Sequence, residues 1–318
     1  MKKIAVMLVA LTIGFTNFPA AESLVEKLGY PADSRLLIVN SDDVGMCHAA
    51  NMAAVEGQEK GMISSGTIMV PCPWFSEIAD YANQNPELRF GVHLTHTSEW
   101  EGYRWGPVAP DSQVPGLIDP DGFLWKGVQS VYQHASSTEA YIEAKAQIER
   151  FINAGIEPTH IDSHMGTLML DPDYFQVYAQ LALEYDLPLR MASQETMAAA
   201  GFPGLRKELA ARGLVFPDYF VYGELGEEYG NRVEETWLEI LSDLKPGVTE
   251  IYIHASTPGA ELRAITNSWE TRVAEYETFA GSAKLKRLLE ENDIKLISYS
   301  PLKKLQRNRK NGSEDGKK

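Results

Sequence analysis

The fold is decided by one stretch, residues 36–45 (LLIVNSDDVG), in which four aliphatic residues lead directly into a pair of carboxylates. Four consecutive aliphatic residues are typical of a strand that is buried on both faces, as in a parallel sheet covered by helices. Asp42 and Asp43 then lie at the carboxyl end of that strand, where parallel α/β proteins gather ligands and catalytic groups. For a single Asp at this place, a turn that caps the following helix is the alternative interpretation.

Because two carboxylates are adjacent here, a metal-binding or catalytic role is favoured over a turn that caps the following helix. Successive residues that leave a strand point in different directions, so one carboxylate can bind a metal ion while its neighbour accepts a proton from a metal-bound water. We therefore predict Asp43 as a metal ligand and Asp42 as a general base.

Segments with strand-like and helix-like patterns alternate along the rest of the chain. The strand-like segments are residues 67–70, 89–94, 160–162, 189–191, 215–220, 250–254 and 295–298. The helix-like segments are residues 46–60, 74–82, 137–154, 174–185, 233–244 and 269–290. About eight such units predict parallel strands in a deformed, TIM-like (β/α) barrel. An open doubly wound sheet is the alternative, although no glycine-rich phosphate-binding sequence follows the first strand.

A chain of 318 residues suits one such barrel with insertions. We predict a catalytic domain over residues 22–302, interrupted by a long insertion at residues 95–131 that is rich in aromatic residues, Gly and Pro. A loop of this length is usually functional or disordered, and its aromatic residues argue against disorder. The polar tail at residues 303–318 is predicted to be disordered and solvated.

The N-terminus has the order of a secretory signal peptide, with Lys2 and Lys3, an apolar run at residues 4–15, and then Ala20 and Ala21. We expect residues 1–21 to be removed on export, which places the mature protein in the periplasm or outside the cell without stable membrane insertion. A retained membrane anchor is the alternative, because the residues before Ala20 are poorly suited to cleavage.

The formal net charge of −15 disfavours nucleic acid as a partner and leaves neutral or cationic small molecules, or uncharged polymers, as easier ligands. The chain has two cysteines, Cys47 and Cys72. In an exported protein they could form a disulfide, or they could be two buried free thiols. The sequence leaves the oligomeric state open, a homodimer included.

Several histidines fall at the ends of predicted strands, namely His93, His164 and His254. In a barrel these strand ends face one another across a single mouth, together with the Asp pair. Imidazole and carboxylate ligands suit a divalent transition metal, with water in the remaining positions. We predict that Asp43, His93 and His164 hold one divalent ion, with zinc as the first choice and magnesium as the alternative.

The remaining histidines are predicted to lie outside this ligand set. Pro158 and the strand pattern argue against a helix that would place His160 and His164 on one face, so His160 is expected to support the site or the core. Asp162 is left undecided between the two roles. The predicted non-ligands are His48, His96 and His134.

Four short motifs occur in order along the chain. They are Asp42-Asp43-Val44-Gly45, Gly91-Val92-His93-Leu94, Thr159-His160-Ile161-Asp162-Ser163-His164 and Tyr252-Ile253-His254. With these motifs the chain resembles the YdjC-like carbohydrate deacetylases, a family that includes chitooligosaccharide deacetylases. The resemblance implies a deformed (β/α) barrel, one divalent metal ion held by an Asp and two His, and hydrolysis of N-acetyl groups on sugars.

The predicted chemistry agrees with deacetylation of a carbohydrate. A metal-activated water attacks the carbonyl carbon, Asp42 accepts the proton of this water, and His254 supplies a proton to the leaving amine. We expect Trp100, Tyr103 and Trp105 to cover the mouth and stack on sugar rings, or else to form a small hydrophobic cluster under the loop.

Two other functions compete with this prediction. A metal-dependent esterase or phosphoesterase would use the same activated water on a different bond. A secreted sugar-binding protein without activity would keep the pocket and lose catalysis. An intact Asp42 beside Asp43 argues against the second, since a binding protein has no need of a base next to a ligand.

Overall fold

The computed structural model describes residues 22–221 and 232–315, with side chains described up to residue 308. The predicted signal peptide at residues 1–21 lies outside the described residues. Among the helices that are described, none combines the length and the apolar character that a membrane crossing requires.

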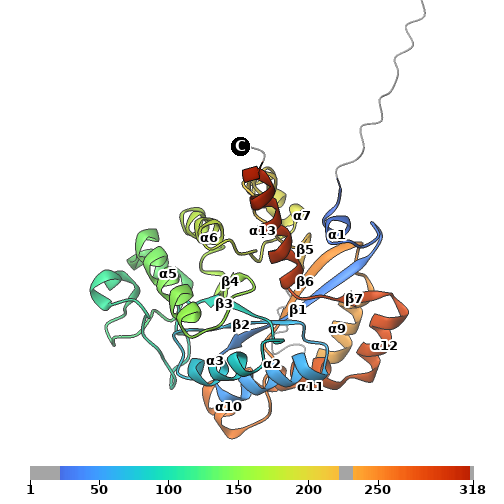
Figure 1. Cartoon of the computed structure of the whole chain (residues 1–318). Helices are drawn as coiled ribbons and strands as arrows, with labels where there is room; N and C mark the ends of the chain where they lie inside the picture. The colour runs from blue at the N-terminus through green and yellow to red at the C-terminus, as the bar shows by residue number, and fades with distance from the viewer. Residues whose placement is uncertain (1–21, 222–231, 316–318) are drawn as a thin grey trace, which may run out of the picture.

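The centre of the molecule is a curled sheet of parallel strands (Figure 1). Its strands are β1 (Arg35–Val44), β2 (Ser65–Ile68), β3 (Phe90–Leu94), β4 (Ile161–Ser163), β5 (Tyr219–Val221), β6 (Gly247–Ile253) and β7 (Ile294–Leu296). Six of them run in the order β4-β3-β2-β1-β6-β5, and β7 pairs with β1. This half-barrel confirms the predicted deformed (β/α) barrel with parallel strands.

The sheet stays open where the prediction placed one more strand. Residues 189–191 form no strand in the described structure, and Leu189 makes a single parallel bridge with Ile161. In the described residues, no strand pairing joins this edge to β5. The prediction of a strand at residues 189–191 is therefore wrong, because the chain there contacts the sheet at one residue only.

Strand β1 is the central element of the sheet. It pairs with β6 along one side, from Arg35 to Ser41. Along the other side, β7 pairs with its first residues and β2 with its last residues. Residues 36–44 are all buried. The predicted strand is confirmed and extends through the Asp pair, which places both carboxylates in the interior of the molecule.

Helices surround the sheet, with α5 and α6 side by side beyond β3 and β4, and α2 beside α11 (Figure 1). They are α1 (Leu24–Lys27), α2 (His48–Lys60), α3 (Phe75–Gln84), α4 (Val128–His134), α5 (Ser137–Asn153), α6 (Pro172–Glu184), α7 (Gln194–Ala199), α8 (Leu205–Ala211), α9 (Val233–Ser242), α10 (Ala260–Ile265), α11 (Trp269–Gly281), α12 (Ala283–Glu291) and α13 (Ser300–Asp315). Short 3-10 turns are η1 (Asp111–Gln113), η2 (Pro115–Leu117) and η3 (His164–Gly166).

Local sequence explains where these helices begin and end. Ser136 and Glu139 form a capping box at the start of α5, and Gly155, with φ +90°, follows its end. The predicted helix at residues 269–290 is two helices, because Ser282 leaves the helical conformation and its side chain caps α12.

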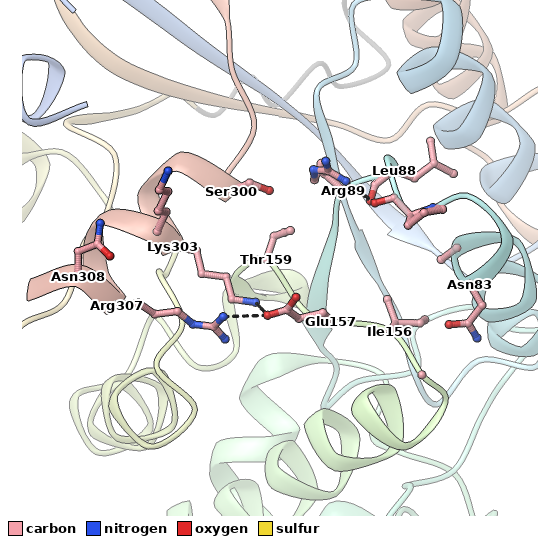
Figure 2. A pocket seen from close by; sticks show the side chains of 14 residues that line it. Asn83, Leu88, Arg89, Ile156, Glu157, Thr159, Ser300, Lys303, Arg307 and Asn308 are labelled. Carbon is pink, nitrogen blue, oxygen red and sulfur yellow. Dashed lines mark hydrogen bonds and ion pairs between the residues drawn. The ribbon is translucent and has the colours of Figure 1, made fainter. Parts of the chain in front are cut away.

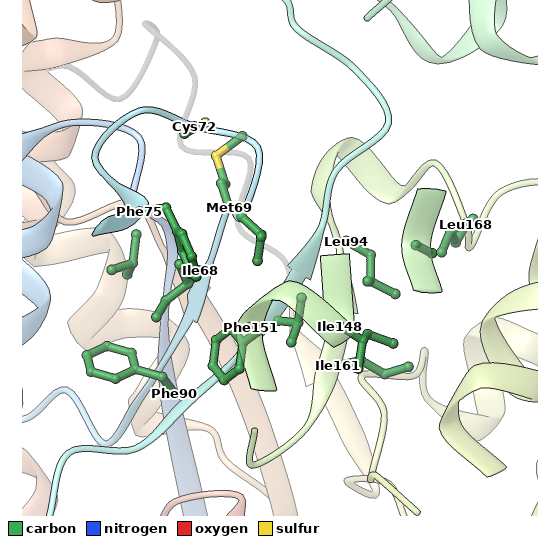
Figure 3. Packing of buried hydrophobic residues seen from close by; sticks show 14 of the residues in the cluster. Ile68, Met69, Cys72, Phe75, Phe90, Leu94, Ile148, Phe151, Ile161 and Leu168 are labelled. Atoms are coloured by element: carbon green, nitrogen blue, oxygen red, sulfur yellow. The ribbon is translucent and has the colours of Figure 1, made fainter. Parts of the chain in front are cut away.

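The largest apolar core lies between the sheet and the helices of the first half of the chain. Phe75, Phe90 and Phe151 meet Ile68 and Ile161 there (Figure 3). Each such side chain contributes about 1.5–3 kcal/mol by leaving water. The two cysteines, Cys47 and Cys72, are buried free thiols, so the disulfide alternative is wrong.

The insertion at residues 95–131 is ordered by buried polar groups of α5. Glu143 accepts hydrogen bonds from the backbone N–H groups of Val108 and Ala109. Gln147 accepts from the backbone N–H of Thr95 and donates to its carbonyl oxygen. These contacts confirm that the insertion is ordered, and they fix where it leaves β3.

Residues 303–315 belong to helix α13, so the predicted disordered tail at residues 303–318 is wrong over this part; residues 316–318 lie outside the described residues. Leu302, Lys303 and Gln306 of α13 are buried. Lys303 donates to the carbonyl oxygen of Pro158, just before β4, and Gln306 accepts from the backbone N–H of Val215, before β5. Helix α13 thus connects the two edges between which the sheet is open.

Candidate metal and catalytic site

The end of β1 is irregular at the Asp pair. Its pairing with β2 shifts between Ser41 and Val44, and Asp43 adopts a left-handed φ of +59°. Such a bulge turns successive side chains toward different neighbours. Gly45 follows with φ +89°, and a Cβ at this residue would come within 3.2 Å of the Met69 carbonyl oxygen. Asp42 and Asp43 therefore reach separate sets of partners.

Asp43, His93 and His164 meet at the carboxyl ends of β1, β3 and β4. The Asp43 Oδ1 atom is 3.4 Å from His93 Nε2 and 3.3 Å from His164 Nδ1, and the two nitrogens are 3.3 Å apart. All three residues are buried. Among the described residues, Asp43 Oδ1 has no hydrogen-bond partner.

This triangle fits a divalent ion. Ligands at about 2.1 Å around a tetrahedral ion are separated by about 3.4 Å, which is close to the three observed distances. A buried carboxylate oxygen without a donor is costly, and a cation would satisfy it. The predicted ligands Asp43, His93 and His164 are thus brought together in a group that can hold a metal ion.

Each imidazole turns its other nitrogen to a carboxylate. His93 Nδ1 is 2.6 Å from Asp162 Oδ1, and His164 Nε2 is 3.1 Å from Glu99 Oε2. A carboxylate there takes the ring N–H and leaves the opposite nitrogen free for a metal ion. Asp162, undecided from the sequence, supports His93. Glu99 belongs to the insertion, and no sequence pattern singled it out.

The ligand group carries an excess of negative charge. Burial alone would lower the pKa of His93, but Asp162 and Asp42 outweigh it and raise this pKa to about 10. For His164, burial is outweighed by Glu99 and Asp43, which raise the pKa to about 9. Without an ion, both rings therefore attract protons, which a bound cation would displace.

Arg272 contacts the second carboxylate oxygen of Asp43 and keeps this carboxylate ionised. The Oδ2 atom of Asp43 accepts a hydrogen bond of 2.8 Å from Arg272 of α11. Burial would raise the pKa of Asp43, but Arg272 and the neighbouring histidines hold it well below the usual range. Sequence reasoning missed Arg272, because its helix lies more than 200 residues away in the chain.

Asp42 belongs to a second network, centred on Arg190. Two guanidinium nitrogens of Arg190 each lie 2.7 Å from an oxygen of Asp42. The same guanidinium contacts Asp162 at 3.1 Å and Glu250 at 2.8 Å. Sequence reasoning also missed Arg190, although a charged residue between buried Leu189 and Met191 was a visible signal.

A second group of candidate ligands is formed by Asp42, His93 and Asp162. Arg190 already places its positive charge against both of these carboxylates. The Asp43 group is therefore better suited to hold a cation, because its Oδ1 atom has no hydrogen-bond partner among the described residues.

His254 follows β6 at the same rim. Its Nε2 atom is 3.9 Å from Asp43 Oδ2, and its side chain is 34 % exposed. Burial lowers the pKa of His254 below its usual range, and Arg272 adds to the effect although Asp43 opposes it. The structure thus places a neutral, partly accessible imidazole beside the candidate metal ligands.

The three predicted sugar-stacking residues differ in exposure. Trp105 is 3 % exposed, packs edge to face on Trp100 and Tyr103, and donates its Nε1–H to the carbonyl oxygen of Thr97. Its ring has no free face, so the prediction that Trp105 stacks on a sugar is wrong. Trp100 and Tyr103 are partly exposed and remain available.

The remaining histidines have other partners. His160 is buried, stacks on Tyr299 and contacts the hydroxyl of Thr159. The contacts of the predicted non-ligands are with Glu77 for His48, the Ala140 carbonyl oxygen for His96 and the Ser130 carbonyl oxygen for His134.

A pocket of about 700 Å³ lies at the other end of the strands (Figure 2). Arg89, just before β3, and residues of α13 line it. Two of its basic residues, Lys303 and Arg307, both bind Glu157, at 2.8 and 2.9 Å. The candidate site is at the carboxyl ends of the strands, so this pocket is not part of it.

A family model described as YdjC-like protein matches residues 36–291. The chain belongs to the YdjC-like family. This match contains residues 36–44 of β1, both Asp residues and every histidine assigned above. The resemblance noted from the motifs is confirmed.

Curated relatives of this YdjC-like chain include a carbohydrate deacetylase of Thermus thermophilus, 34 % identical over 80 % of this chain and 89 % of the relative. A carbohydrate deacetylase of Enterococcus faecalis is 29 % identical over 85 % of this chain and 98 % of the relative. A chitooligosaccharide deacetylase of Yersinia enterocolitica is 29 % identical over 84 % and 98 %.

Among solved structures, a protein of Enterococcus faecalis V583, described as a candidate cellobiose-phosphate cleavage protein, has a TM-score of 0.73 and 28 % identity. The match covers 85 % of this chain and 99 % of that one. The curled parallel sheet is therefore the fold of a solved relative.

Proposed function

We propose that this YdjC-like chain is a carbohydrate deacetylase that needs one divalent ion and releases acetate from an N-acetylated sugar. The observation that carries the proposal is the open Asp43 Oδ1 atom, which faces His93 Nε2 and His164 Nδ1 at 3.4 and 3.3 Å. Relatives that are carbohydrate deacetylases support the substrate class.

A divalent ion held by Asp43, His93 and His164 would supply Lewis acidity and would lower the pKa of a nearby water. Asp42 takes the proton of the attacking water. Arg190 and Asn40 hold the Asp42 carboxylate in place by hydrogen bonds of 2.7–2.8 Å. A carboxylate has about four acceptor positions, so these bonds leave Asp42 able to accept a proton.

His254 gives a proton to the leaving amine nitrogen in this proposal. Its partial exposure lets it reach a substrate at the rim. Because its pKa is lowered, His254 is neutral at rest, so it takes the proton that it gives to the amine from solvent at the rim. Asp42 returns the proton of the attacking water to solvent, which completes the turnover. In this proposal Trp100 and Tyr103, which are partly exposed, supply ring surface for a sugar.

The other two functions fit the site less well. A phosphoester would bring negative charge to a site whose two arginines, Arg190 and Arg272, are already paired with the carboxylates of Asp42 and Asp43. A binding protein without activity would not need Asp42 fixed beside the ligands. An ester of a sugar remains chemically close to an amide, and the ratio of amide to ester rates distinguishes the two activities.

The direct test is a screen of N-acetylated sugars of one to six units for released acetate, at equal loading with zinc. We expect acetate from at least one of them, and background release from Asp42→Asn protein. Absence of acetate from every sugar, with one zinc ion bound per chain, would overturn the proposed function.

Export through residues 1–21 also stays a proposal. Its support is the order of basic, apolar and small residues at the N-terminus. The mass of the protein isolated from its host tests it: loss of about 21 residues is expected on export, and a full-length soluble cytoplasmic pool would contradict it.

A further inference from the structure

We propose that Glu99 is a positioning residue for His164, through which the insertion at residues 95–131 tightens metal binding. The inference rests on the proposed metal site. Glu99 Oε2 lies 3.1 Å from His164 Nε2, on the side of the ring away from Asp43. The His164 imidazole thereby lies between two carboxylates, that of Asp43 at the proposed metal site and that of Glu99 on the insertion.

The two candidate histidine ligands are supported in different ways. Asp162, which supports His93, is fully buried in β4 and is held by Thr67 at 2.8 Å and Arg190 at 3.1 Å. Glu99, which supports His164, is 23 % exposed and comes from the insertion, 65 residues before its partner. The support of His93 is thus part of the sheet, whereas the support of His164 depends on how the insertion is placed.

The insertion holds Glu99 in place through its neighbours. The backbone N–H of Ser98 donates to the Trp125 carbonyl oxygen at 2.8 Å. Trp105 donates its backbone N–H to Ser98 Oγ and its Nε1–H to the Thr97 carbonyl oxygen, at 3.0 and 3.1 Å. The buried Trp105, which cannot stack on a sugar, therefore fixes the backbone that carries Glu99.

The contact with Glu99 influences which nitrogen of the His164 imidazole carries the proton. When Nε2–H donates to Glu99, the proton is kept off Nδ1, and the Nδ1 lone pair faces Asp43 Oδ1. The carboxylate also keeps the ring from rotating and makes it a more basic ligand. Losing a partner of this kind typically weakens metal binding about 10–100-fold.

The test measures zinc affinity of metal-free protein by competition with a chromophoric chelator. Glu99→Gln keeps the size of the side chain and a neutral acceptor, and should weaken zinc binding about 10-fold; Glu99→Met removes the acceptor and should weaken it further, toward about 100-fold. Glu101→Gln is the matched control, because Glu101 lies two residues away, is 87 % exposed and pairs with Lys126. Its zinc affinity should equal that of the wild type.

A second measurement separates positioning from general stability. The metal-free Glu99 variants should unfold at a slightly lower temperature than the wild type, because they lose the contact with His164, and the rise on adding zinc should be smaller. If both Glu99 variants bind zinc with an affinity within twofold of the wild type, the inference is overturned and the proposed function still stands. Equal loss of stability with and without zinc would also overturn it. A wild-type protein that binds no zinc would overturn the metal site itself.

Discussion

Asp42 and Asp43 are neighbours in the chain but belong to different charge networks. Asp43 faces His93 and His164 and is held by Arg272, whereas Asp42 is held by Arg190. The left-handed φ at Asp43 is what separates them. One carboxylate can therefore act as a ligand and the other as a base, although their Cα atoms are adjacent.

The ligand roles can be tested by removing one imidazole at a time. His93→Ala and His164→Ala should each abolish tight binding of a divalent ion, because each removes one corner of the triangle. His134→Ala is the control, since His134 lies on α4 and stacks on Trp125. Elemental analysis that finds one ion per chain in either of the first two variants would show that the ligands are wrongly assigned.

The base and the acid can be separated by two substrates. Asp42→Asn should retain the ion and reduce turnover by about 100-fold or more on both an N-acetyl sugar and an activated acetate ester, because both need water activation. His254→Ala should reduce only the amide rate strongly, since a phenolate leaves without a proton. The ratio of amide to ester rates is the measurement. If His254→Ala loses the same factor on both, His254 does not protonate the leaving group.

At the scale of elements, sequence patterns located most strands because each is a short run of aliphatic residues ending in a polar one. They could not locate partners that come from distant elements. Arg190, Arg272 and Glu99 reach the site from a loop, a helix and the insertion, and only the fold brings them together. The same limit explains the wrong prediction for Trp105. A tryptophan can stack on a sugar ring or pack in a hydrophobic core, and the residue type alone does not distinguish the two.

Helix α13 shows why the polar composition of residues 303–318 led to a wrong prediction of disorder over residues 303–315. Its residues are mostly polar, but Lys303 and Gln306 satisfy backbone groups of segments next to β4 and β5. Such pairing depends on tertiary neighbours and leaves no periodic signal. The polar composition alone therefore indicated a solvated tail.

Two truncations test the role of α13. A chain ending at Ser298 loses buried Tyr299, Leu302 and the two polar contacts, and should be destabilised by several kcal/mol, about 2–5 for the Leu alone. A chain ending at Asn308 keeps these contacts and should match the full chain. Urea unfolding of both measures the difference. Equal stability of the Ser298 truncation and the full chain would contradict a connecting role.

At the scale of the whole molecule, buried neutral histidines make stability depend on pH. Burial lowers the pKa of His96 to about 4 and that of His160 to about 3. The unfolded chain binds protons from about pH 6.5 downward, whereas these folded histidines do not. Their contribution is therefore complete above about pH 6.5 and is lost as the pH falls toward 4.

His96→Gln isolates this effect, because its amide can still donate to the Ala140 carbonyl oxygen that His96 Nε2 contacts. Between pH 6.5 and 4, the variant should lose stability less steeply than the wild type, by up to about 1.4 kcal/mol per pH unit. His134→Gln, at an exposed position, should follow the wild type. Chemical unfolding across this pH range gives the slopes, and parallel curves for wild type and His96→Gln would refute the assignment.

The central claim is that one ion held by Asp43, His93 and His164 is required for hydrolysis. The most direct measurement follows acetate release and zinc content on the same sample, first after complete removal of metal by a chelator and then during stepwise return of zinc. Acetate release should fall to background and recover in proportion to bound zinc, with saturation at one ion per chain. Undiminished acetate release from protein without bound metal would contradict the account.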